Sequence, residues 1–227
     1  MPWTDTITTL GRPLGLALAA IAVLSTGCSR TGNITGEIIF TTPSGSEQPA
    51  AHVTILAIQA TKTFEQDWRA AVAAFEEELA PARRERDEAA QSLEGARLAW
   101  TKAVGTTPAG GHRTHGLLAS ARHRELWAAL RAAERRLAAA ERRMREIGRK
   151  HDPLAAAVVE RHATQRIETD ATGHYVFAAL PAGPTYLYTR LTVAQQPVLW
   201  FRTVTIRPGI EHLDLIGANA GGWPFLW

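Results

Sequence analysis

The feature that most constrains this sequence is a change in the spacing of its apolar residues. In the middle of the chain they recur at alternating intervals of four and three, first over 68–103 and again over 126–158. A connector rich in Gly and Pro, at 105–116, separates the two heptad series. Two apolar stripes of similar length can bury each other only if the chain folds back. We therefore expect an antiparallel coiled-coil hairpin over 62–162.

The two arms of this hairpin are expected at about 62–104 and 117–162. Each contains a proline. Pro81 lies in the middle of the first arm without a good cap before it, which predicts a kink. Pro153 follows Asp152, a pair that suits an N-cap with proline at the first helical position. We therefore expect the returning helix to break and restart at Pro153.

On both sides of the hairpin, apolar and polar residues alternate, which predicts β-strands. The candidate strands are 34–42, 52–60, 164–170, 174–180, 184–193, 197–206 and 210–216. Turn sequences that contain Gly, Pro, Asp or Gln separate the later ones, as in an antiparallel sandwich. The predicted fold class is α+β: a seven-stranded antiparallel β-sandwich of 34–61 plus 163–217, with the hairpin inserted between the second and third strands.

A family resemblance is carried by the strand and turn residues of these flanks. They are Gly36, Val53, Ile55, Thr169, Asp170, Gly173, Tyr175, Phe177, Leu180, Pro181, Gly183 and Tyr186. The pattern resembles the carboxypeptidase regulatory-like domain, a prealbumin-like (transthyretin-like) seven-stranded sandwich, and it does not extend to the helical insertion. In that family the domain is an accessory or binding module and not the peptidase, so the resemblance implies no active-site residue.

The N-terminal region predicts export with a lipid anchor. An apolar run at 14–24 is too short to span a bilayer but has the length of a signal-peptide core. Gly27 then precedes Cys28, the single cysteine of the chain. This resembles the lipobox of bacterial lipoproteins, which implies a signal peptide at 1–27, lipid attachment at Cys28 and a linker at 28–33. The alternative is an ordinary secretory signal with a chance cysteine.

The residue after the cysteine bears on localisation. It is Ser29, and in Gram-negative lipoproteins a residue other than Asp at this position usually permits sorting to the outer membrane. We therefore expect a membrane protein of the cell envelope held by its lipid, with the outer membrane favoured if the source is Gram-negative. Several acyl chains on one residue anchor a protein stably, whereas one chain is marginal.

Basic residues concentrate in the helical segment, where 20 of the 25 Lys and Arg lie within 62–166. The cluster on the returning arm is Arg135, Arg136, Arg142, Arg143, Arg145, Arg149 and Lys150. Acidic residues lie among them, and nucleic acid is a poor partner for an exported protein. We expect a solvated face or, alternatively, contact with anionic headgroups, a polysaccharide or an acidic envelope protein. A coiled-coil hairpin could equally associate with itself.

Features that carry chemistry are scarce. His112, His115 and His123 could meet at the hairpin tip, but no carboxylate or cysteine lies nearby, so we expect a solvated loop and no metal. The turn at 170–173 lacks the alternating oxygen ligands of a calcium loop and is better explained by Asp capping and Gly at positive φ. The carboxylates at 76–78 suit a charged helix face. We therefore expect no catalytic, metal or cofactor-binding residue.

The chain ends in an aromatic segment, 218–227, with four large apolar residues after a Gly-Gly pair. Packing back on the sandwich is one reading, and an exposed docking peptide or interfacial anchor is the other.

Together these features indicate a non-enzymatic, lipid-anchored envelope protein whose sandwich is a binding or scaffold module. Its coiled-coil arm would bind a partner or act as a spacer. The alternatives are a periplasmic adaptor of an export system, by analogy with other β-domains that carry hairpins, and a metal-dependent enzyme that uses the histidines of the tip.

Overall fold

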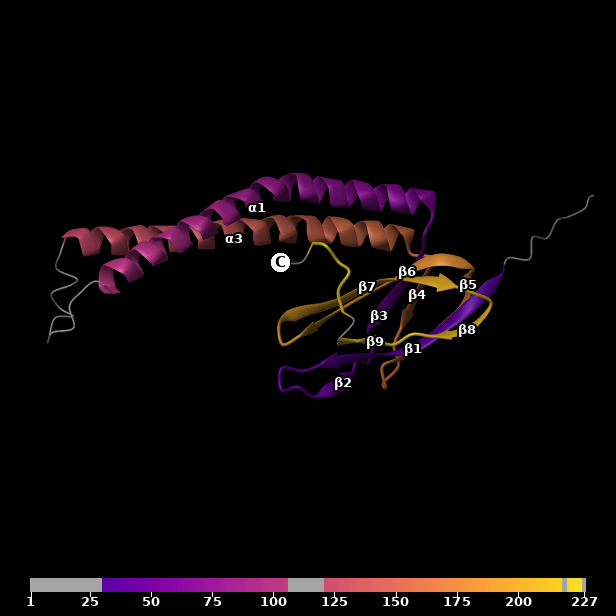
Figure 1. Cartoon of the computed structure of the whole chain (residues 1–227). Helices are drawn as coiled ribbons and strands as arrows, with labels where there is room; N and C mark the ends of the chain where they lie inside the picture. Colours follow the sequence, from indigo (N-terminus) through magenta and orange to yellow (C-terminus); the bar gives the residue numbers. More distant parts are fainter. Residues whose placement is uncertain (1–29, 106–120, 218–219, 226–227) are drawn as a thin grey trace, which may run out of the picture.

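The structure is a computed structural model in which residues 30–105, 121–217 and 220–225 are described. Its two long helices are α1 (Lys62–Gly105) and α3 (Ala121–His162). The strands of the described residues are β1 (Thr31–Thr41), β2 (Glu47–Pro49), β3 (Thr54–Gln59), β4 (Gln165–Glu168), β5 (His174–Pro181), β6 (Gly183–Val193), β7 (Gln196–Ile206), β8 (Gly209–His212) and β9 (Leu215–Ile216). The α+β class with two long helices and two sheets is confirmed (Figure 1).

The strands form two sheets. In the second sheet the order is β4-β3-β6-β7, and every pair is antiparallel. In the first sheet β1 is central: it pairs antiparallel with β2 and β5 and parallel with β8 and β9. The sandwich of the described residues thus has nine strands with two parallel pairings, and the prediction of seven antiparallel strands is wrong.

Two local causes account for the difference. Strand β2 forms in a segment rich in Gly, Ser and Pro between the first two predicted strands, because this segment folds back on the end of β1. The single strand predicted at 210–216 is divided into β8 and β9. Between them Leu213 N–H donates to the carbonyl of Thr35, while Glu37 N–H donates to the Asp214 carboxylate at 3.0 Å. A side-chain acceptor there replaces a backbone carbonyl, so the ladder is interrupted.

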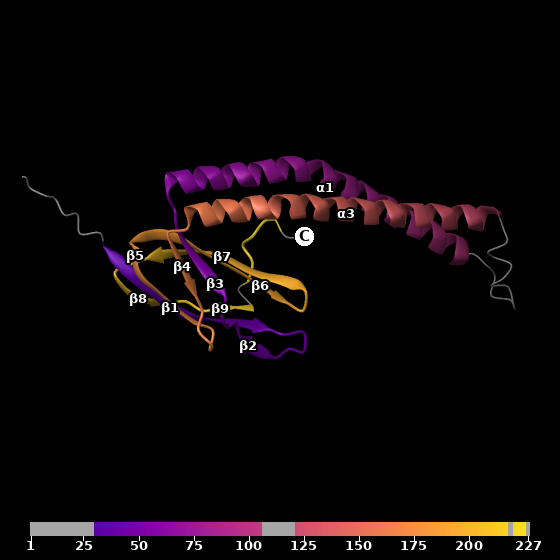
Figure 2. The same cartoon turned by 180° about the vertical axis from the view of Figure 1, so that it is seen from behind.

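The second sheet is apolar on both faces, and β3 shows why. Ile55 and Ala57 point into the core between the sheets, with Phe177 and Trp200. The alternate residues of β3, Leu56 and Ile58, belong to a second core that also contains residues of α1 and α3. The helical hairpin is therefore a third layer that covers the outer face of this sheet (Figures 1 and 2).

The two helices run in opposite directions, since the start of α1 contacts the end of α3 and later residues of α1 contact earlier residues of α3. The supercoiled packing of a coiled coil remains a prediction. Helix α3 is continuous through Pro153, so the predicted break is wrong. Pro153 is exposed, and the ion pair of the preceding Asp152 with Arg190 holds this turn of α3 in place. Helix α1 is continuous through Pro81 and bends partway along its length (Figures 1 and 2).

Candidate functional site

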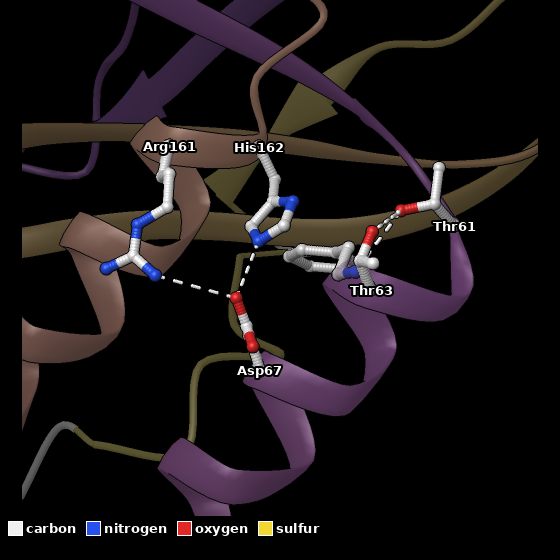
Figure 3. Close-up of polar contacts among 6 residues, drawn as sticks. Thr61, Thr63, Asp67, Arg161 and His162 are labelled. Carbon is white, nitrogen blue, oxygen red and sulfur yellow. Dashed lines mark hydrogen bonds and ion pairs between the residues drawn. The ribbon is translucent and has the colours of Figure 1, made fainter.

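The base of the helical arm is held by Asp67 of α1. Its carboxylate accepts a hydrogen bond from His162 Nε2 at 2.8 Å and lies 3.5 Å from an Arg161 guanidinium nitrogen, both at the end of α3 (Figure 3). Helix α1 begins with a side-chain cap, because Thr61 Oγ1 accepts from the backbone N–H of Phe64 at 3.2 Å. The second turn of α1 and the last turn of α3 are therefore held together by Asp67.

Farther along the arm, Glu78 ties the helices together. Its carboxylate lies 2.7 Å from Lys150 Nζ and 2.8 Å from His151 Nε2. The hydrogen bond from Lys150, and to a smaller extent that from His151, lowers the pKa of Glu78 below its usual value. His151 is buried, with its ring 5.5 Å from that of Phe75. Glu76 instead pairs with Arg83 on its own helix. The Glu78 carboxylate thus links α1 to α3, and the Glu76 carboxylate makes an ion pair within α1.

An aromatic cluster joins the arm to the second sheet. Trp68 of α1 lies 4.6 Å from the ring of Phe201 on β7 and 5.2 Å from that of Trp223 in the C-terminal segment. The ring of Phe225 lies 4.9 Å from that of Phe75, which follows Trp68 by two turns of α1. Trp223 and Phe225, the aromatic residues in the described part of the C-terminal segment, are buried. Of the two readings of this segment, the structure shows packing back for its described part, 220–225.

Asp152 makes the polar contacts between the arm, the second sheet and the C-terminal segment, although the sequence predicted it to be an N-cap. One carboxylate oxygen accepts from Trp223 Nε1 at 2.8 Å, and the other from an Arg190 guanidinium nitrogen at 2.7 Å. Asp152 lies inside α3 and is not the N-cap that was predicted. The sequence gives no signal for this role, because Asp152 is not a member of the heptad series of the returning arm.

The C-terminal segment reaches the aromatic cluster along the edge of β7. Gly221 N–H donates to the carbonyl of Leu199 at 2.7 Å, and Phe201 N–H donates to the carbonyl of Gly221 at 2.9 Å. Gly222 follows with φ +80°, and a Cβ there would lie 2.2 Å from the carbonyl oxygen of Phe201. Only glycine allows this approach. The Gly-Gly pair therefore forms the turn that directs Trp223 into the aromatic cluster.

The distal part of the arm is built from helix contacts alone. Its small core consists of Leu93, Leu130 and Ala133, with Ala96, Trp100 and Leu137 packed around them. Trp127 lies 5.4 Å from Trp100 between ring centroids and is 40% exposed, and the guanidinium of Arg131 lies 4.4 Å above its ring. Leu98, 63% exposed, and Val104 add apolar surface on α1. The described end of the arm thus presents apolar and aromatic side chains to solvent.

The predicted site residues are placed as follows. Cys28, His112 and His115 lie outside the described residues. His123 is half-buried on α3, where its ring meets Trp100 edge-on at 6.1 Å, so it packs in the distal arm. Among the described residues, no cluster of three or more His, Cys, Asp or Glu side chains could hold a metal ion.

The turn that follows β4 is a capped turn, as predicted. Asp170 Oδ1 accepts from the backbone N–H of Thr172 at 2.8 Å, from its hydroxyl at 2.7 Å and from the N–H of His174 at 3.0 Å. Gly173 has φ +79°. These hydrogen bonds, first that of the Thr172 hydroxyl, lower the pKa of Asp170. One oxygen of the Asp170 carboxylate thus accepts all three hydrogen bonds of the turn.

A groove of about 340 Å³ runs between the helices in the middle of the arm. Its lining is mostly charged and of both signs: Arg83, Arg86, Asp87, Glu141, Met144 and Arg145. Arg86 is paired with Asp87, and Arg83 with Glu76 outside the groove. Three arginines and two carboxylates line the groove, so its positive and negative charges largely offset each other.

Comparisons with known proteins identify no family. No protein-family model matches the sequence, and no curated protein matches it. Among solved structures, a candidate carbohydrate-binding protein of Pseudomonas aeruginosa matches with TM-score 0.35 and 11% identity over 83% of this chain and 89% of that one. The pilus backbone protein of Streptococcus pneumoniae matches with TM-score 0.24 and 12% identity over 78% of this chain and 35% of that one. These scores carry no inference about function, and the carboxypeptidase regulatory-like family stays a prediction.

In the same described residues, no helix is long and apolar enough to cross a membrane. The fold and its surfaces define a β-sandwich with a rigidly attached helical arm.

Proposed function

We propose that this chain is a non-enzymatic, lipid-anchored protein of the cell envelope, in which the sandwich is a scaffold and the helical arm binds or spaces a partner. The observation that carries the proposal is the division of the arm into two parts. Its basal part is fixed to the second sheet by the aromatic cluster around Trp68, Phe201 and Trp223. Its distal part packs only on itself and exposes Leu98 and Trp127. A surface held at a fixed distance from a platform suits a binding arm.

The anchor is supported by the sequence, in which an apolar core is followed by small residues and then by Cys28. Acylation of this thiol would hold the chain to a membrane, with the outer membrane favoured in a Gram-negative bacterium. Replacement of Cys28 by Ser should move the protein from the membrane fraction to the soluble fraction, and the acyl groups should disappear from its mass. Unchanged membrane association would contradict the anchor.

The partner of the arm is proposed to be an envelope protein or a polysaccharide. The test is in-cell photocrosslinking from position 98 or 127, with position 176 as control. Val176 is 51% exposed on the sandwich and lies away from the arm. Adducts specific to the two arm positions and lost on Arg131→Glu would support partner binding. Adducts of twice the chain mass would identify self-association, and equal labelling from all three positions would contradict a binding arm.

A further inference from the structure

Several segments far apart in the sequence meet at one end of the sandwich. They are the start of β1 (30–31), the entry to α1 (60–62), the β5–β6 turn (181–184) and the β7–β8 turn (207–209). The contacts that join them are Ala182 N–H to Arg30 O at 2.8 Å, Ala60 N–H to Pro184 O at 3.0 Å, and the pairing of Gly32 with Gly209. Because α1 begins and α3 ends here, the basal end of the arm and the first described residues of the chain lie at the same end (Figure 1).

The charged residues of these segments are Arg30, Lys62 and Arg207, all exposed and all basic. Within the described part of the chain, none of the three has an ion-pair partner. The partial positive charge at the N-terminus of α1 is offset by the partial negative charge at the C-terminus of α3, which ends at the same place, so the side chains decide the charge of this end. The acidic residues nearest in sequence are Glu65, in the first turn of α1, and Glu211, two residues after Gly209. This end, called the basic end below, therefore carries net positive charge.

The surroundings of the basic end are compatible with an interface to lipid. Ile210 follows Gly209 and is 76% exposed, more than any other large apolar side chain of the described residues. Pro184 and Pro208 are also exposed in the neighbouring turns. Basic side chains around exposed apolar ones are the composition that binds the headgroup region of an anionic membrane.

The position of the proposed lipid anchor indicates that the partner of the basic end is the membrane surface. Cys28 lies two residues before Arg30, and two residues span at most about 7 Å. An acyl group on Cys28 would therefore hold the basic end against the membrane. We infer that the basic end, through Arg30, Lys62 and Arg207, rests on anionic lipid headgroups, and this inference depends on the proposed anchor for its biological setting. Helix α1 has 44 residues, so the distal end of the arm would then stand about 60 Å from the membrane.

The test uses the full chain with Cys28→Ser, so that no acyl group contributes to binding. Its affinity is measured by co-sedimentation with vesicles of phosphatidylcholine and with vesicles of an equal mixture of phosphatidylcholine and phosphatidylglycerol. The neutral vesicles report the contribution of the apolar N-terminal run. The excess affinity for the anionic vesicles reports the basic end, and it should disappear at high salt.

The variant is Arg30→Glu, Lys62→Glu and Arg207→Glu together. Each basic residue near an anionic surface contributes about a factor of five, so loss of three should weaken binding to the anionic vesicles by at least a hundredfold. A matched control reverses three exposed basic residues of the arm, Arg97, Arg135 and Arg142, and should leave the affinity unchanged. Circular dichroism checks that both variants are folded.

The inference is overturned if the variant of the basic end binds anionic vesicles as its parent does, or if the arm control loses as much affinity. It is also overturned if neutral and anionic vesicles bind the parent equally. Failure of the anchor gives a different result: the wild-type chain from cells would then lack acyl groups by mass spectrometry, whatever the vesicle measurements show.

Discussion

Replacement of Trp223 by Ala is the sharpest test of how the arm is attached. The side chain is 7% exposed and lies in ring contact with Trp68, Tyr188, Phe201 and Phe225. Removal of a buried Trp side chain costs about 3–5 kcal/mol of unfolding free energy. For a chain of this size each kcal/mol lowers Tm by about 2–4 °C, so Trp223→Ala should lower Tm by about 10 °C.

The assay is thermal and urea unfolding followed by circular dichroism at the helical band. Trp223→Phe separates the two contributions, because it keeps most of the aromatic area and removes the hydrogen bond to Asp152, at a cost of about 1–2 kcal/mol. Trp127→Ala, in the exposed distal arm, is the control and should change stability by less than about 1 kcal/mol. If Trp223→Ala were no more destabilising than Trp127→Ala, the C-terminal segment would not be part of the core, and the reasoning would be refuted.

Three further predictions concern single sites. Since hydrogen bonds hold the pKa of Asp170 below that of the unfolded chain, its stabilising contribution is present at neutral pH and lost on acidification; the difference in urea midpoint between wild type and Asp170→Asn should shrink as the pH falls below about 4. Gly222→Ala should destabilise the fold much more than Gly45→Ala, since both have positive φ but only Gly222 lies against a β7 carbonyl, and comparison of their Tm values tests this. Phe75→Ala should cost about 3–5 kcal/mol in urea unfolding, while Glu85→Ala, which removes an exposed ion pair, should have a far smaller effect.

The sequence predicts the elements well where one periodicity persists. The heptad spacing identified both helices, and their ends lie close to the expected limits because Thr61 supplies a cap and a Gly-rich connector follows α1. The alternation identified the long strands. It could not reveal that β8 and β9 run parallel to β1, because an alternating pattern is the same in either direction. Pro153 was misjudged because contacts from outside the helix, through Asp152, hold that turn in place.

The surfaces were harder to predict than the elements. Strand β3 has apolar residues on both of its faces, and its outer face is covered by the helical arm together with Trp223 and Phe225. That contact joins residues from three distant parts of the chain, so no local pattern contains it. The basic end has the same origin, since Arg30, Lys62 and Arg207 are isolated in sequence and meet only because the strands bring their turns together.

The central place of β1 has a consequence for folding kinetics. This first strand is hydrogen-bonded to strands from the end of the chain, and the Glu37–Asp214 contact spans 177 residues. Contacts so distant in sequence close slowly, because the entropy of a long loop is lost before the pairing stabilises the chain. Until the last strands arrive, β1 lacks the partners on one of its sides and the aromatic face of the second sheet lacks Trp223. We therefore expect partly folded forms of this chain to have an open strand edge and exposed aromatic surface, which are the features that chaperones bind.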